Sequence, residues 1–148
     1  MKISIYNRQK DLKISKVSAK KAFISAANLY GTLFDEAAVH FVSEKELCQL
    51  HEQFFNDPSP TDCITFPVDS EDTPGYRFLG EVFVSPKAAL EIVEASGGDP
   101  YEETTLYMIH GLLHLLGYND IKKDDIVEMR KEESKIMNHL KNEGLCLK

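Results

Sequence analysis

The sequence predicts an α+β fold, with a small, mixed four-stranded sheet and about five helices around a central buried helix. Strand and helix patterns follow one another in the order β-α-β-α-β-β-α-α-α, which is not a regular βαβ repeat. Residues 106–116 are apolar on nearly every side, which is typical of a helix covered by other elements. The chain has 148 residues and no repeat or internal boundary, so we expect a single domain over residues 1–148.

Four segments carry the signs of β-strands, namely apolar runs or period-two alternation between turn residues. They are the start of the chain around Ile3 and Ile5, then residues 37–42, 63–66 and 78–84. We expect His40, in the second of these, to be a packed or edge side chain and not a ligand. The acidic, turn-rich residues 68–76 predict an exposed loop before the last strand.

Five segments have helical patterns, and three of them begin at clear helix-start signals. They are residues 15–30, the helix opened by Ser43 and Glu46, the helix opened by Ser85 and Pro86, the helix opened by Asp99 and Pro100, and residues 122–141. Serine or aspartate before the first turn can accept a hydrogen bond from a backbone N–H that has no helical partner. Proline suits the first helical position because its own N–H is absent.

The net charge of −7 discourages a general nucleic-acid-binding role, but the charge is unevenly distributed. Residues 1–21 contain seven Lys and Arg against one Asp, a local charge of +6 that leaves −13 for the remainder. Such a cluster is typical of a phosphate-facing patch or of a solvated helix face, and charge alone favours the second interpretation.

Bulk features also limit the location and cofactors of the protein. Cys48, Cys63 and Cys146 lie far apart without a CxxC pair, which argues against disulfides and a cysteine-rich zinc site. No apolar run approaches the roughly 18 residues needed to cross a bilayer, and the start is too short and polar for a signal peptide. We therefore expect a cytoplasmic protein with no membrane partner and no dinucleotide cofactor.

The chemistry is concentrated in residues 110–120. His110 and His114 are four residues apart on the apolar helix, so both imidazoles share one face. Gly117 suits the position after a helix end, where a turn brings Asp120 back toward the histidines. Two nitrogens and one carboxylate oxygen with an open fourth position form the ligand set of a catalytic zinc site. We expect His110, His114 and Asp120 to bind one divalent metal ion, with Zn²⁺ as the best candidate.

Two alternatives bear on this site. Asp120 precedes the last helix and is also suited to be its N-cap, although the two histidines favour the ligand role. Position 111 is glycine, whereas the HExxH metalloproteases use glutamate there as a general base, which disfavours peptide hydrolysis. A metal ion that activates water and neutralises phosphate charge fits phosphodiester hydrolysis.

The stretch HGLLHLLGY at 110–118 resembles the signature of the YbeY family, metal-dependent endoribonucleases linked to ribosomal RNA maturation. PTDCITFP at 60–67 is similar to the family's PTDVLSFP, and LGEVFVS at 79–85 is similar to its LGDIVIS strand. The resemblance covers residues 1–143 in the right order. It implies an α+β fold with a zinc site in a cleft, and a role in small-subunit ribosomal RNA 3′ end maturation and ribosome quality control.

Two positions depart from the pattern of the resembled family. Its three ligands are histidines spaced HxxxHxxxxxH, and the third falls on Asp120, a harder ligand that shifts metal preference toward manganese or iron. The family arginine before the PTD segment falls on Phe55, which can stack on a base but cannot pair with phosphate. Arg77, Lys87 and the N-terminal cluster are possible substitutes, although ordinary surface charge is the better interpretation of each.

Two acidic residues near these motifs have open roles. Glu81 is suited to orient a metal-bound histidine, and Asp62 to cap or turn the loop after Pro60. A structural role is favoured for both.

The leading hypothesis is a metal-dependent endoribonuclease acting on single-stranded RNA, with ribosomal RNA and the small ribosomal subunit as partners. Metal-bound water would be the nucleophile, and no protein residue is assigned as catalytic. A ribosome-associated binding factor with little catalysis is the main alternative, motivated by Phe55 and Asp120. Another zinc-dependent hydrolase is a third possibility, which Gly111 argues against.

Overall fold

The computed structural model describes residues 1–57, 59, 61–68 and 75–148. Within these residues the chain forms the predicted α+β fold, with four strands and five helices in the predicted order. They are β1 (Lys2–Asn7), α1 (Lys16–Asn28), β2 (Glu36–Phe41), α2 (Glu44–Phe55), β3 (Cys63–Pro67), β4 (Phe78–Val84), α3 (Pro86–Ser96), α4 (Pro100–Leu115) and α5 (Lys123–Asn142).

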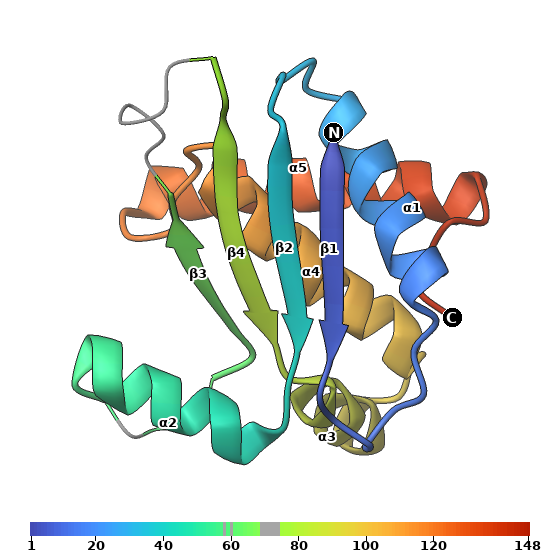
Figure 1. Cartoon of the computed structure of the whole chain (residues 1–148). Coiled ribbons are helices and arrows are strands. Elements are labelled where there is room, and N and C mark those ends of the chain that lie inside the picture. The colour runs from blue at the N-terminus through green and yellow to red at the C-terminus, as the bar shows by residue number, and fades with distance from the viewer. Residues whose placement is uncertain (58, 60, 69–74) are drawn as a thin grey trace.

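The sheet is mixed, with strand order β1-β2-β4-β3. Strand β2 pairs in parallel with β1 and β4, whereas β3 is antiparallel to β4 and forms an edge of the sheet. Helix α4 crosses one face of the sheet diagonally, with α1 and α5 on the same side (Figure 1). Helix α2 lies beside the lower ends of the strands, so it leaves much of the opposite face uncovered (Figure 1).

Helix α4 is the predicted central helix. Its apolar side chains Met108, Ile109, Leu112 and Leu113 are fully buried, because the sheet lies on one side of the helix and α1 and α5 on the others. Burial of apolar surface on this scale is the main stabilising contribution to the fold. The C-terminal half of α4 packs against β3 and β4, and this contact determines where its histidines lie.

Glycine allows α4 to approach the sheet at two points. A Cβ atom at Gly111 would overlap the Val82 side chain and lie 3.1 Å from the Cys63 sulfur. A Cβ atom at Gly80, where φ is +146°, would lie 2.7 Å from Cδ2 of Leu115 on α4. Gly111 thus has a packing role of its own: the helix touches the sheet at this position, and no side chain fits there.

The opposite face of the sheet carries His40, which is only 9% exposed. Its ring stacks between Tyr6 and Phe83, with ring centroids 4.7 and 4.2 Å away. Its Nδ1 lies 3.0 Å from Arg8 and its Nε2 lies 3.0 Å from Glu81. The prediction that His40 is a packed side chain is confirmed.

The structure confirms some of the capping hydrogen bonds predicted from the helix-start signals and not others. Asp99 accepts a hydrogen bond from the Tyr101 N–H at 2.8 Å, as predicted for an N-cap. Ser43 accepts one from the Glu46 N–H at 3.1 Å, but the Glu46 carboxylate pairs with Arg8 instead of completing the capping box. Ser85 stands at the N-cap of α3, yet its buried hydroxyl makes no hydrogen bond within the described residues, so its predicted capping bond is wrong.

The predicted loop and the end of α2 lie between elements of the fold. Most of the predicted loop at 68–76 falls on residues 69–74, which lie outside the described residues. Helix α2 ends at Phe55, where Asn56 adopts a left-handed conformation with φ of 56°. No helix in the described part of the chain has the length and apolar character needed to cross a membrane.

Candidate metal centre

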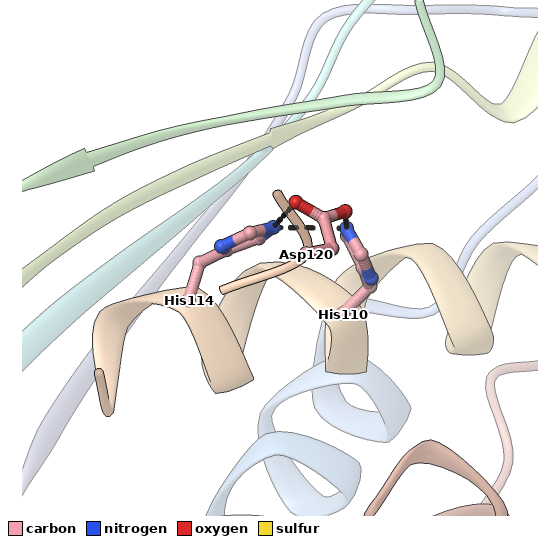
Figure 2. Close-up of side chains that lie close together, drawn as sticks. All are labelled: His110, His114 and Asp120. Carbon is pink, nitrogen blue, oxygen red and sulfur yellow. Dashed lines mark hydrogen bonds and ion pairs between the residues drawn. The ribbon is translucent and has the colours of Figure 1, made fainter. Parts of the chain in front are cut away.

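His110 and His114 lie one turn apart on α4, and their rings point to the same side of the helix. Figure 2 shows both imidazoles rising from α4 toward the Asp120 carboxylate, which comes from the segment beyond the helix end. The two Nε2 atoms are 3.0 Å apart. The structure therefore brings together all three side chains that the sequence singled out.

The turn after α4 explains how Asp120 reaches the histidines. Gly117 has φ of 102°, a conformation that favours glycine because it has no Cβ atom. The Gly117 N–H donates to the His114 carbonyl at 3.1 Å, and the Tyr118 N–H donates to the Leu113 carbonyl at 3.0 Å. This pair of bonds is the Schellman ending of a helix, which reverses the chain direction.

Asp120 uses its two oxygens on the two histidines. Oδ2 lies 3.4 Å from His110 Nε2, and Oδ1 lies 3.7 Å from His114 Nε2. The alternative N-cap role is wrong, because α5 begins at Lys123 and the residue at its N-cap is Lys122. The Asp120 carboxylate is 40% exposed and remains available to a cation.

The spacing of these atoms suits a metal ion. One ligand atom from each of His110, His114 and Asp120 lies within 4.8 Å of the others. A tetrahedral zinc ion with ligands at about 2.0–2.2 Å separates those ligands by about 3.3–3.6 Å. The observed nitrogen–nitrogen and nitrogen–oxygen separations of 3.0, 3.4 and 3.7 Å surround that range. Two imidazoles and one carboxylate also match the donor types of catalytic zinc sites.

Glu133, on α5, is a site residue that the sequence reasoning missed. Its carboxylate is 4% exposed and lies 3.6 Å from His110 Nδ1, on the side of the ring away from Asp120. It also accepts a hydrogen bond of 2.7 Å from Arg130. Burial alone raises the pKa of Glu133, but the hydrogen bonds from His110 and Arg130 outweigh it and lower that pKa. The negative carboxylate holds a proton on Nδ1, which leaves the Nε2 lone pair of His110 for a metal.

The environment of His114 also favours the ligand form of imidazole. Burial and the neighbouring His110 lower the pKa of His114, and they outweigh the opposing effect of Asp120. A lowered pKa keeps the ring neutral at neutral pH, and a neutral ring is the form that binds metal.

A cavity of about 240 Å³ adjoins the two histidines. It is lined by His51 and Phe55 of α2, by residues 63–65 of β3, and by His110 and His114. Burial raises the pKa of the Cys63 thiol, and the converging group of ligand atoms consists of His110, His114 and Asp120 without Cys63. Phe55 had been singled out only by its place in the pattern of the resembled family, and no sequence pattern pointed to His51.

Among the described residues that line this cavity there is no Lys or Arg. Arg77 instead donates from its guanidinium to the Leu33 carbonyl at 3.2 Å, beside β2. Lys87 and the basic residues of the N-terminal segment are also not among the lining residues. The structure thus favours ordinary surface charge for these groups.

Glu81 and Asp62 do not orient the histidines of the candidate site. Successive residues of a strand face opposite sides, so Glu81 lies on the far side of β4 from Val82, which packs on α4. Glu81 accepts from His40 instead, at 3.0 Å. The Asp62 carbonyl accepts from the Ser85 N–H at 3.1 Å, and the Asp62 side chain makes no hydrogen bond within the described residues.

An α+β domain with two histidines and a carboxylate converging beside a cavity is typical of metal-dependent hydrolases. The model of the family "Endoribonuclease YbeY" matches residues 4–141, and the chain belongs to this family of hydrolytic ribonucleases. It is 42% identical over 146 residues to the endoribonuclease YbeY of Protochlamydia amoebophila, covering 99% of this chain and 97% of the relative. It is 36% identical over 151 residues to the Chlamydia pneumoniae protein, covering 99% and 96%.

A solved structure supports the same fold. The solution structure of TM1509 from Thermotoga maritima aligns with a TM-score of 0.59 and 26% identity. The alignment covers 95% of this chain and 93% of that one. The family resemblance expected from the sequence motifs is therefore confirmed.

Proposed function

We propose that this chain is an endoribonuclease that cuts single-stranded RNA at a metal ion held by His110, His114 and Asp120. The observation that carries the proposal is the convergence of two Nε2 atoms and a carboxylate within 4.8 Å. With a proton on Nδ1 of His110, its Nε2 is an acceptor, and the facing carboxylate only accepts. A cation bound between these acceptor atoms would offset the repulsion between their lone pairs.

A divalent metal bound there would activate water near neutral pH and neutralise charge that develops on phosphate. The residues of the chain orient and tune this site: Glu133 sets the tautomer of His110, and Asp120 supplies negative charge. We propose zinc as the first candidate. The carboxylate ligand makes manganese or iron the next candidates, because oxygen ligands suit harder metals.

We propose ribosomal RNA as the substrate, with cleavage in maturation of the small-subunit 3′ end and in ribosome quality control. Membership of the endoribonuclease family supports RNA as the substrate class. The specific RNA and the small-subunit partner follow from the resemblance to that family. Cytoplasmic action accords with this role.

The direct test compares the wild-type chain with His114→Ala. We expect the wild type to bind one zinc ion and to cleave single-stranded RNA when reloaded with zinc or manganese. The variant should lose both properties. His139→Ala is a matched control, because His139 lies on α5 and bonds Ser25 at 2.9 Å, away from the site. Equal cleavage by wild type and His114→Ala would refute the proposal.

A second candidate function is a ribosome-associated binding factor of the same fold with little catalysis. It is favoured by the absence of Lys and Arg among the residues lining the cavity, since such cations often stabilise phosphoryl transition states. Binding of metal-loaded protein to small ribosomal subunits without RNA cleavage under any metal would establish it.

A further inference from the structure

We propose that the cavity between α2 and β3 is a nucleobase subsite, in which Phe55 stacks on one base of single-stranded RNA. This inference rests on the proposed function, because it takes RNA as the ligand of the adjoining site. It goes further by assigning the recognition of one base to two residues of α2, Phe55 and His51.

Phe55 presents an aromatic ring at the mouth of the cavity. It is the last residue of α2, and its side chain is 53% exposed although it is large and apolar. The ring is supported by Phe66 and His51, with centroids 6.3 and 5.7 Å away. The helix end is held by the Asn56 N–H, which donates to the Glu52 carbonyl at 2.9 Å. A supported ring with an exposed surface is suited to stacking on a base.

His51 supplies a polar atom to the same cavity. Its Nδ1 lies 2.9 Å from the Ser59 carbonyl oxygen, which can only accept, so Nδ1 is the donor. In the neutral ring Nε2 then carries the lone pair, and within the described residues it makes no hydrogen bond. An acceptor at this place suits an N–H donor on the edge of a base, such as the exocyclic amino group of adenine, cytosine or guanine.

The size and charge of the cavity favour a base over a phosphate. Its volume of about 240 Å³ is below the range of about 300–1,000 Å³ typical of drug-sized ligands, so it suits a single ring system. The lining residues that the structure describes include no Lys or Arg to pair with phosphate. Because the same cavity includes His110 and His114, a base held there belongs to a nucleotide next to the candidate metal centre.

The test measures binding without cleavage. Metal-free protein is titrated into a fluorescein-labelled single-stranded RNA of about ten nucleotides, and anisotropy gives the Kd. We expect Phe55→Leu to weaken binding by about 5- to 150-fold, the range for loss of one stacked base, and Phe55→Trp to preserve binding. Phe54→Leu is the matched control: Phe54 is adjacent and 56% exposed, but it is not a lining residue of the cavity. Equal losses in Phe55→Leu and Phe54→Leu, or no loss in Phe55→Leu, would overturn the proposal.

An abasic scan locates the base. The wild type should bind an RNA with one abasic position more weakly only when that position is the stacked base. In Phe55→Leu, an abasic nucleotide at that position should cause no further loss of affinity. Replacing the base at that place by 3-methyluracil, which presents no N–H donor, should weaken binding to the wild type but not to His51→Phe, which keeps an aromatic ring without the acceptor. Additive effects of the abasic position and Phe55→Leu would contradict stacking. These measurements do not depend on catalysis, so a failure of RNA cleavage affects the proposed function and leaves the binding result intact.

Discussion

Two histidine–carboxylate groups lie on opposite faces of the same sheet and illustrate two different uses of imidazole. On one face, His40 places Nδ1 against Arg8 and Nε2 against Glu81, each at 3.0 Å. Arginine only donates and a carboxylate only accepts, so a single neutral tautomer with the proton on Nε2 satisfies both contacts. His40 is fully paired by its neighbours and needs no further ligand.

The other face holds His110 and His114 in the opposite arrangement. Their Nε2 atoms face each other at 3.0 Å, with the Asp120 oxygens 3.4 and 3.7 Å away. The Glu133 carboxylate lies 3.6 Å from Nδ1 of His110 and favours a proton on that nitrogen, which leaves the lone pair on Nε2, facing this group. The two groups differ in how their polar atoms are arranged. The two ring nitrogens of His40 face separate partners, one a donor and the other an acceptor, whereas the polar atoms of the candidate metal centre face one another and are mostly acceptors.

The largest expected effect that separates the two groups comes from Asp120→Ala. Loss of a ligand should weaken zinc binding by more than the roughly 10- to 100-fold typical of losing an outer partner. Asp120→His should restore zinc binding. Competition with a chromophoric chelator measures both affinities, and Asn119→Ala provides the adjacent control.

Because Asp120 does not cap α5, metal-free Asp120→Ala should unfold at the wild-type denaturant midpoint. A loss of about 1 kcal/mol in the metal-free state would instead indicate a capping role.

A smaller effect is expected from Glu133→Gln, which keeps the size of the side chain and removes its charge. Zinc affinity should fall by about 10- to 100-fold because the His110 tautomer is no longer held. Glu132→Gln is the matched control: Glu132 is the adjacent buried acid, but it accepts from the Tyr30 hydroxyl and not from His110. Unchanged zinc affinity in Glu133→Gln, measured by the same competition, would show that Glu133 does not orient the ligand.

The smallest effect on metal binding should come from His40→Leu, which should leave the zinc stoichiometry and affinity unchanged. The free energy of unfolding should fall by about 0.5–1.5 kcal/mol, the net contribution of a typical hydrogen bond, because Arg8 and Glu81 lose a partner but are exposed enough to be hydrated. Chemical denaturation of the metal-free protein measures this change. Weaker zinc binding by His40→Leu would contradict the separation of the two groups.

The local sequence determined the elements and the core of the candidate site. Spacing of four residues on an apolar helix placed His110 and His114 on one face, and Gly117 marked the turn that returns Asp120. The bounds of β4 were predicted at Phe78–Val84 because its apolar run is continuous and bounded by turn residues. These features follow from helix and strand periodicity and from glycine conformation, which depend on neighbours in the chain.

Contacts between distant segments were decided by the tertiary structure alone. Glu133 was not predicted: an acid at a core-facing position of α5, between Met129 and Ile136, is a signal that could have pointed to it, but its contact with His110 depends on how α5 packs on α4. The same holds for Phe55 and His51, which share a cavity with the histidines only because α2 packs on β3 and β3 packs on α4. Periodicity gives the direction of a side chain about its own element, whereas the partner in that direction depends on packing between elements.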